Sequence, residues 1–267
     1  MNTLSLRLAY LFRIACAMCF IGHGAFGIIT KPVWCNYFGV FGIGEATAYQ
    51  LMPIVGIIDI LLGVLLLVYP LRFAAGWLVF WGLFTASLRP LSGEPFGEFL
   101  ERAGNYGAPL LLLMLTTTHR LSAGDWFRKM DMHQDLDEDR WKLVTRMMQL
   151  TAFLLLAGHG WLNVIEKAGL LKQYAALGFE DPQHVAHIVG ALEIAGAFMI
   201  LLKPFRYVVL AFFIWKMGSE LFYPAYPVWE WVERGGSYAV LLGLWLINSK
   251  FQISNSKLNA LNLKSGI

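Results

Sequence analysis

The sequence predicts an all-α polytopic membrane protein, with eight transmembrane helices in two tandem four-helix bundles related by a pseudo-two-fold axis along the membrane normal. Three observations support this fold class: the composition, a series of long apolar segments and an internal repeat. Hydrophobic residues make up 57% of the 267 positions and charged residues 15%, whereas soluble domains carry about 25% charged residues. The mean hydropathy is +0.56. These values argue against a soluble globular enzyme and exclude a disordered chain.

A transmembrane helix needs about 20 predominantly apolar residues, and eight segments come close to that length. They are Leu8–Ile29, Leu51–Tyr69, Phe73–Leu88, Phe96–Thr117, Leu143–Ile165, Val185–Leu202, Phe205–Phe222 and Trp229–Asn248. The fourth and eighth segments have short apolar runs, so we expect each of them to begin within its preceding polar stretch.

The distribution of lysine and arginine sets the expected orientation, since cytoplasmic loops of membrane proteins are enriched in both. With the N-terminus in the cytoplasm, 14 of the 21 basic residues fall on the cytoplasmic side, six on the other side and Lys216 within a span. Both termini are therefore expected to be cytoplasmic, with the lipid bilayer as a partner. A net charge of +3 from dispersed basic residues disfavours nucleic-acid binding.

An internal repeat divides the chain into two units of four spans each. The tripeptide Gly-His-Gly at 22–24 recurs at 158–160, the segment 55–59 recurs at 189–193, and the segment 101–106 recurs at 233–238. The expected domains are 1–118, the first unit; 119–142, a cytoplasmic connector; 143–249, the second unit; and 250–267, a polar tail. Because each unit has an even number of spans, the two units share one orientation in the membrane.

Ionisable residues within the spans are the main functional candidates. Each costs about 2.5–3.5 kcal/mol to insert, so we expect them to face the interior of a bundle or a wet cavity. The candidate catalytic residues are His23, Asp59, His159 and Glu193, and the candidate cofactor-binding residues are Glu101, Arg102, Tyr106, Glu233, Arg234 and Tyr238. These residues are expected in the outer half of the membrane, as one cluster in each bundle. Lys216 and Glu220 are expected to pair one helical turn apart.

Several uses of these groups remain open on the sequence alone. His23 and His159 suit hydrogen bonding between closely packed helices, ligation of a metal ion or haem, and proton transfer or binding of a quinone carbonyl. The two Glu-Arg pairs suit ion pairing at helix starts. Cys16 and Cys19 are either small apolar residues of the first helix or a redox pair facing a quinone. Trp81 is assigned to packing rather than to cofactor stacking.

Several segments resemble the DoxX-like superfamily of integral membrane proteins, present here as a tandem duplication of the four-helix unit. Arg13, Phe20, Gly22, Gly27 and Lys31 are similar to its first helix, the stretch 55–68 to its second, and the Gly-x-Tyr sequences at 104–106 and 236–238 to its fourth. The resemblance implies a location in the bacterial plasma (inner) membrane. Some members of the superfamily are linked to quinones and to sulfur or thiol redox chemistry, and others act as assembly factors.

The leading functional hypothesis is a DoxX-like, redox-associated protein that binds a quinone, a haem or a metal ion in the outer-half clusters. In this hypothesis His23 or His159 is the ligand or proton acceptor, a carboxylate orients it, and the arginine and tyrosine groups hold an anionic or carbonyl oxygen. Such a protein is a quinone-linked oxidoreductase or a subunit of one. The alternatives are a transporter of a small solute or of protons, and a non-catalytic subunit or assembly factor with a membrane-protein partner.

Overall fold

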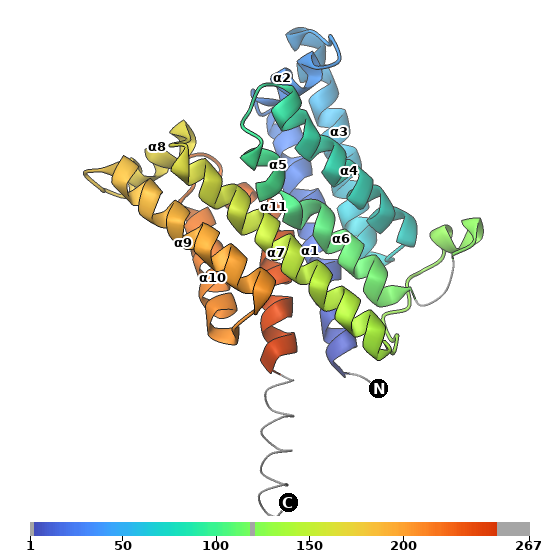
Figure 1. The fold of residues 1–267 in the computed structure, drawn as a ribbon. Helices are drawn as coiled ribbons and strands as arrows, with labels where there is room; N and C mark the ends of the chain where they lie inside the picture. The colour runs from blue at the N-terminus through green and yellow to red at the C-terminus, as the bar shows by residue number, and fades with distance from the viewer. Residues whose placement is uncertain (1–2, 118–120, 250–267) are drawn as a thin grey trace, which may run out of the picture.

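The computed structural model describes residues 3–117 and 121–249, which form an all-α structure (Figure 1). The first unit contains α1 (Thr3–Ile29), α2 (Trp34–Gly39), α3 (Glu45–Val68), α4 (Arg72–Leu91), α5 (Gly97–Glu101) and α6 (Ala103–Thr116), and the 3₁₀ helix η1 (Ala123–Phe127) follows it. The second unit contains α7 (Glu138–Val164), α8 (Ala168–Ala176), α9 (Pro182–Leu202), α10 (Arg206–Ser219), the 3₁₀ helix η2 (Glu220–Phe222), α11 (Pro227–Glu233) and a last helix at residues 235–249. The prediction of an all-α fold is confirmed.

Among the described residues, three helices are long and apolar enough to cross a membrane, namely α1, α3 and α9. The 27 residues of α1 rise about 40 Å, which exceeds the ~30 Å thickness of the hydrocarbon core of a bilayer. The helices α7 and α8 are long and apolar enough when taken together, with a bend of 81° between them. The described residues therefore contain three to four candidate spans, which indicates a multi-pass membrane protein in contact with lipid.

The outward face of α3 carries the exposed apolar side chains that contact with lipid requires. Ile54, Ile57, Ile58, Leu61 and Val68 are between 49% and 74% exposed. A continuous apolar face of this kind is unfavourable in water and is typical of a surface that another apolar phase covers. The core-facing side of the same helix carries Gly56 and Gly63, where α1 approaches closely.

The remaining expected spans are shorter or interrupted, so the described residues do not show eight continuous crossings. α4 has 20 residues, whereas α6 and α10 have 14 each. The fourth expected span is broken at Arg102, between α5 and α6, and the eighth at Arg234, before the helix 235–249. The two breaks have the same hydrogen-bond pattern. The N–H of Asn105 donates to the Arg102 carbonyl, and the N–H of Ser237 donates to the Arg234 carbonyl, each at 2.9 Å.

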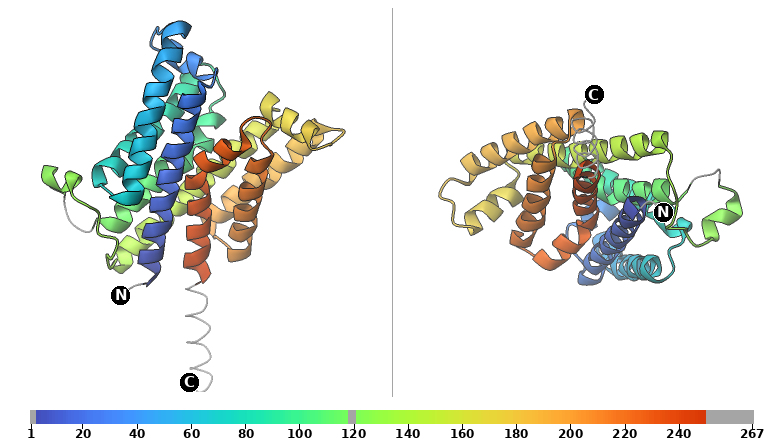
Figure 2. Two further views of the ribbon diagram at one scale, coloured as in Figure 1. Left: turned by 180° about the vertical axis from the view of Figure 1, so that it is seen from behind. Right: turned by 90° about the horizontal axis from the view of Figure 1, so that it is seen from below.

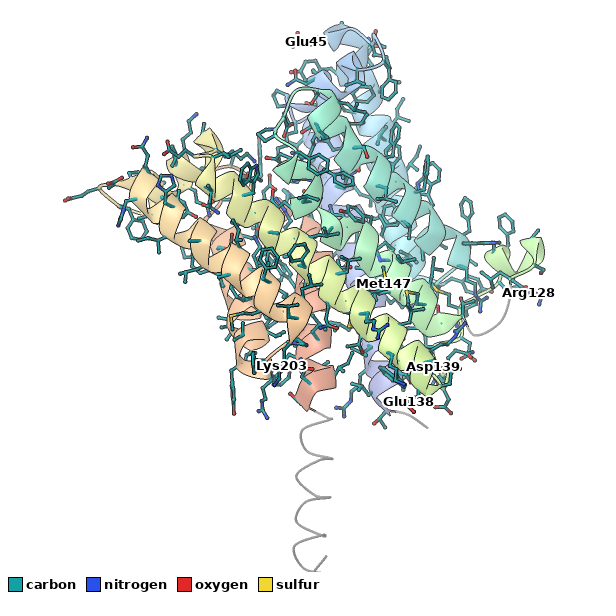
Figure 3. The ribbon with its side chains drawn as sticks, in the orientation of Figure 1. Glu45, Arg128, Glu138, Asp139, Met147 and Lys203 are labelled. Atoms are coloured by element: carbon teal, nitrogen blue, oxygen red, sulfur yellow. The ribbon has the colours of Figure 1, made fainter. Side chains whose placement is uncertain are left out.

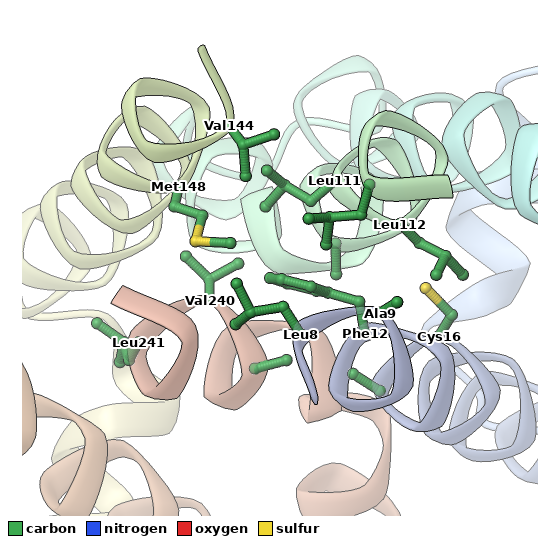
Figure 4. Packing of buried hydrophobic residues seen from close by; sticks show 14 of the residues in the cluster. Leu8, Ala9, Phe12, Cys16, Leu111, Leu112, Val144, Met148, Val240 and Leu241 are labelled. Carbon is green, nitrogen blue, oxygen red and sulfur yellow. The ribbon is translucent and has the colours of Figure 1, made fainter. Parts of the chain in front are cut away.

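A large apolar core lies where the two units meet (Figure 4). α1 contributes Leu8 and Phe12, α6 contributes Leu111, α7 contributes Met148, and the helix 235–249 contributes Val240, all of them fully buried. α1 also packs against α11, and α7 packs against α5. Each unit therefore places its first helix against the broken fourth span of the other unit, and the apolar core extends across both units.

The ribbon views show how the chain begins and ends in this arrangement (Figures 1 and 2). The start of α1 and the end of the helix 235–249 lie at one end of the molecule, and α2 lies at the opposite end. Figure 3 places Glu138, Asp139 and Lys203 toward the former end and Glu45 at the latter. The described chain thus begins and ends on the same side, as an even number of crossings would require.

Candidate functional site

The glycines of the two Gly-His-Gly motifs allow the first helix of each unit to pack tightly on the long helix that follows. A Cβ atom at Gly24 would lie 2.5 Å from the carbonyl oxygen of Gly56, and a Cβ atom at Gly190 would lie 2.7 Å from that of Gly160. Small residues at such crossings let two helix backbones approach closely. The close approach brings the histidine between the glycines within reach of a carboxylate on the neighbouring helix.

In the first unit, a histidine, a carboxylate and a tryptophan from three helices form one hydrogen-bonded group. Nδ1 of His23 on α1 lies 2.7 Å from Oδ2 of Asp59 on α3. The indole N–H of Trp81 on α4 donates to the same oxygen at 3.3 Å. Asp59 is buried, and the His23 ring centre lies 4.6 Å from that of Trp34. The imidazole is thereby held between a carboxylate and an aromatic ring, which leaves Nε2 for another partner.

The second unit repeats this group and extends it. Nδ1 of His159 on α7 lies 2.5 Å from Oε2 of Glu193 on α9, and the indole N–H of Trp215 on α10 donates to the other carboxylate oxygen at 2.9 Å. The amide nitrogen of Asn163 lies 3.3 Å from Nδ1 of His159, and the Tyr174 hydroxyl donates to the Asn163 amide oxygen at 2.7 Å. The second histidine therefore belongs to a larger hydrogen-bonded group than the first.

The two tryptophans are site residues that the sequence reading missed. That reading assigns Trp81 to packing, whereas its indole N–H binds the buried carboxylate of Asp59. Trp81 and Trp215 are 134 positions apart, the same spacing that separates Asp59 from Glu193. This shared spacing is the signal that identifies the tryptophans in the sequence.

Two lysines form reciprocal ion pairs between the units. Lys31, which follows α1, contacts Glu230 on α11, and Lys167, which follows α7, contacts Glu98 on α5. Both glutamates are buried. Lys31 and Lys167 are equivalent positions of the repeat, as are Glu98 and Glu230. Each unit supplies the lysine for the glutamate of the other, which is the pattern of a surface that meets its own copy across a two-fold rotation.

The Glu-Arg pairs at the two helix breaks lie in the same region as the lysine–glutamate pairs, since Lys167 and Arg102 both contact Glu98. We call these ion pairs together the ionic layer between the units. Nη1 of Arg234 lies 2.9 Å from Oε1 of Glu101 in the other unit. Nη1 of Arg102 lies 3.2 Å from Oε2 of Glu98 and 3.6 Å from Oε2 of Glu101. The sequence predicts one Glu-Arg pair in each bundle, where each pair would stabilise the start of its own helix. The structure instead joins them through Glu101, which contacts Arg102 of its own unit and Arg234 of the other, because buried charges need partners.

Backbone contacts repeat the reciprocal pattern of the lysines. A Cβ atom at Gly22 on α1 would lie 2.4 Å from the backbone nitrogen of Glu233, and one at Gly158 on α7 would lie 2.4 Å from the backbone nitrogen of Glu101. Each Gly-His-Gly motif therefore serves two contacts. One of its glycines faces the neighbouring helix of its own unit, and the other faces the helix break of the other unit.

His23 lines a cavity with a volume of about 150 Å³. Trp34 from α2, and Trp81 and Phe84 from α4, supply aromatic walls. The rings of Trp81 and Phe84 are stacked, with centres 5.5 Å apart. The cavity thus has flat aromatic surfaces on more than one side of the imidazole.

The same cavity is also lined by charged groups. Lys31, Arg89 and Arg102 face it, together with Glu233 from the second unit. Each of the three cations is also paired with a glutamate outside the lining, so the cavity presents cationic groups whose charge is partly neutralised from behind. Oδ1 of Asn105, in the same lining, is buried and has no hydrogen-bond partner in the described part of the chain. An acceptor left without a donor costs stability, so this atom suits a ligand that carries an O–H or N–H group.

His159 lines a larger cavity, with a volume of about 520 Å³. Tyr174, Trp215 and Tyr223 contribute to its lining, and no lysine or arginine does so among the described residues. Glu220 is the carboxylate in this lining, and its Oε1 lies 3.0 Å from Nζ of the lysine one turn before it. That contact confirms the expected pairing of positions 216 and 220.

The structure brings most of the predicted site residues to the cavity walls or to the ionic layer. Those that line a cavity are His23, Arg102, Glu233 and His159. Asp59 and Glu193 bind Nδ1 of His23 and His159, and Glu101 and Arg234 form an ion pair between the units.

The two predicted tyrosines lie apart from the histidines. Tyr106 and Tyr238 are absent from the linings of both cavities. The hydroxyl of Tyr106 reaches the carbonyl of Phe99 at 3.4 Å, and the ring of Tyr238 lies beside that of Trp231, with centres 5.5 Å apart. Both rings pack against the short helix that precedes the break in their own unit.

The residues described here offer no set of three or more His, Cys, Asp or Glu side chains that could hold a metal ion. His23 and His159 each meet one carboxylate, which is fewer than the three or four protein ligands of an ordinary zinc site. Cys16 and Cys19 are buried and free within the apolar core, and neither lines the two cavities. The chain matches no protein-family model, no curated protein and no solved structure.

Proposed function

We propose that this chain is a DoxX-like membrane protein that binds a quinol in the cavity of the first unit, with His23 as the hydrogen-bond and proton acceptor. The observation that carries the proposal is the group of His23, Asp59 and Trp81, which holds the imidazole at the wall of an aromatic cavity. The volume of this cavity, its hydrogen-bond acceptors and its arginines each support the binding of a quinol.

The volume of the first cavity suits a single six-membered ring. An engineered apolar cavity of about 150 Å³ binds benzene, and this cavity has the same volume. Its aromatic walls favour a flat ring, since aromatic pairs gain energy by offset stacking. A haem macrocycle is several times larger, and a metal ion would have too few ligands. Of the three predicted cofactors, a quinone headgroup is therefore the one that these residues fit.

Two hydrogen-bond acceptors in the lining favour the reduced form of the ligand. When neutral His23 donates its Nδ1–H to Asp59, Nε2 becomes an acceptor. Oδ1 of Asn105 is a second acceptor without a partner. A quinol offers two O–H groups to these atoms, whereas a quinone offers two carbonyl oxygens. As the proton moves from one O–H group to Nε2, Asp59 stabilises the imidazolium and Arg89 and Arg102 stabilise the phenolate oxygen.

The proposal includes eight crossings of the plasma membrane, with both termini in the cytoplasm and a pseudo-two-fold axis between the units. The 20 residues of α4 suffice for about 30 Å, and η2 extends α10. The broken spans continue because the charge of each arginine is neutralised by glutamates within the ionic layer. The reciprocal lysine–glutamate pairs support the two-fold relation, and the excess of lysine and arginine at the N-terminal side supports the orientation.

Titration of the purified protein with a quinol tests the proposal. Decylubiquinol and decylubiquinone are added in turn, and the quenching of tryptophan fluorescence is followed. We expect saturable binding of the quinol that is tighter than binding of the quinone. His23→Ala should weaken quinol binding about three- to tenfold, since a hydrogen bond between neutral groups is worth about 0.5–1.5 kcal/mol. His184→Ala, at an exposed histidine of α9, is the matched control, and equal quinol affinities of the two variants would contradict the proposal.

Transport of a small solute or of protons is the second candidate function, and the two broken helices favour it. Discontinuous helices form the substrate sites of many transporters, and both breaks here place an arginine within the ionic layer. Flux into liposomes that falls in the variants Asp59→Asn and Glu193→Gln would support transport. Flux equal to that of the unmodified protein would exclude both carboxylates from such a path.

A further inference from the structure

We infer that the cavity of the second unit is a separate binding site, for a neutral, membrane-soluble ligand that carries a carbonyl oxygen and is larger than a single ring. The two cavities occupy equivalent places in the repeat, since each is lined by the histidine and the tryptophan of its unit. They differ in volume, in charge and in their free hydrogen-bonding groups, and these differences point to different ligands.

The second cavity is more than three times as large as the first, at about 520 Å³ against about 150 Å³. Its volume falls within the range of about 300–1,000 Å³ that is common for small-molecule sites. Val185, Val189, Ile214 and Phe222 form apolar parts of its wall. Ile214 and Phe222 are also 61% and 57% exposed, so the wall continues into the surface that lipid would contact. A ligand dissolved in the membrane therefore has a direct route to this cavity.

The three cations of the first cavity have no counterpart in the lining of the second. The position equivalent to Arg89, 134 residues later, is Tyr223. The equivalents of the other two cations, Lys167 and Arg234, contact glutamates of the first unit and do not line the cavity. Glu220, which does line it, is already paired with a lysine. An anionic ligand would be buried here without a positive partner, which is costly, so the lining selects a neutral one.

Tyr223 is the donor that a neutral ligand would meet. Its hydroxyl makes no hydrogen bond to any other described residue. It lies in the segment between η2 and α11, where burial raises its pKa above the ordinary value, so the hydroxyl keeps its proton and donates. Nδ1 of His159 and the Tyr174 hydroxyl are by contrast bound to Glu193 and Asn163, and Nε2 of His159 is an acceptor when Nδ1 carries the proton. One free donor within an apolar lining favours a ligand with a carbonyl oxygen.

Pyrenebutyrate methyl ester and pyrenebutyrate are matched probes for this site. They share a skeleton of four fused rings, which exceeds the first cavity, and they differ in charge. Energy transfer from tryptophan to pyrene reports binding to the protein in nanodiscs, and empty nanodiscs correct for partition into lipid. We expect saturable binding of the neutral ester, about tenfold or more tighter than binding of the anion. No saturable transfer, or equal affinities for the two probes, would overturn the inference.

Variants of Tyr223 test the role of its hydroxyl. Tyr223→Phe should weaken ester binding about three- to tenfold, the equivalent of about 0.5–1.5 kcal/mol for one hydrogen bond. Tyr226→Phe, at an exposed tyrosine outside the lining, should bind as the unmodified protein does. Tyr223→Arg introduces the residue of the first cavity and should shift the preference toward pyrenebutyrate. Thermal unfolding of each variant establishes that it is folded, and equal ester affinities of Tyr223→Phe and Tyr226→Phe would refute the assignment of the donor.

Discussion

Gly22 and Gly158 are positions at which one added methyl group tests the contact between the units. A Cβ atom at either would lie 2.4 Å from a backbone nitrogen of the other unit, about 1 Å closer than ordinary van der Waals contact. The opposing atoms belong to the backbone of Glu233 or Glu101, which cannot rotate away as a side chain can. Alanine at either glycine therefore forces α1 or α7 away from the helix break that it contacts.

The cost of this displacement follows from two opposing terms. Overpacking a tight contact destabilises a protein by about 1–3 kcal/mol, and the upper part of that range applies where backbone atoms collide. Replacing glycine by alanine within a helix gains up to about 1 kcal/mol. We expect Gly22→Ala and Gly158→Ala each to lower the free energy of unfolding by about 1–2 kcal/mol. The double variant should lose less than the sum of the two, because the opening made by one methyl group partly accommodates the other.

Unfolding in mixed micelles of dodecyl maltoside and sodium dodecyl sulfate, followed by far-UV circular dichroism, measures these losses. Gly39→Ala is the matched control, since a Cβ atom there would meet nothing within 4 Å. Its stability should be unchanged or slightly raised. If Gly22→Ala proved as stable as Gly39→Ala, the packing of α1 against α11 would be refuted. Fully additive losses in the double variant would instead show that the two contacts open independently.

Two further changes test the ionic layer and the second histidine group in the same assay. Lys31→Met leaves the buried carboxylate of Glu230 without its cation and should lower the free energy of unfolding by about 3 kcal/mol. Adding Glu230→Met should restore most of that loss, and a double variant as unstable as the single one would argue against a direct pair. Trp215→Phe removes the hydrogen bond to Glu193 and should cost about 1 kcal/mol. Trp161→Phe, at a half-exposed position of α7, is its control, and equal losses would mean that the indole N–H adds nothing to stability.

The pairing of each histidine with a carboxylate could be predicted from the sequence because it depends on two short-range facts. Glycines beside His23 permit a close helix crossing, and Asp59 falls at a similar depth on the next long helix. An ionisable residue in an apolar segment must find a polar partner, and few are available at that depth. The same reasoning holds for His159, whose carboxylate is retained as glutamate, so the structure agrees with the sequence at both positions.

The helix breaks and the contacts between units could not be predicted in this way. Hydropathy is averaged over a window, so an arginine such as Arg102 within an apolar stretch does not reveal whether the helix stops there. A buried guanidinium at such a break needs carboxylate partners, and for Arg234 the partner is Glu101, which is 133 positions away in the chain. Trp81 was missed for a related reason, because a tryptophan in a membrane helix is apolar by composition and its N–H matters only once a buried acceptor faces it.

The reciprocal contacts also explain why the two cavities were free to become different. In an assembly of two identical four-helix chains, the residue at position 89 would recur unchanged in the second cavity. Within one chain, Arg89 and Tyr223 can differ, because each cavity is lined almost entirely by its own unit. The lysine–glutamate pairs are constrained more strongly, since a change on either side leaves a buried charge without a partner. We therefore expect the interface to keep its symmetry while the cavities lose theirs, so that a single chain binds two ligands of different size and different hydrogen-bonding groups, which a symmetric pair of identical chains cannot do.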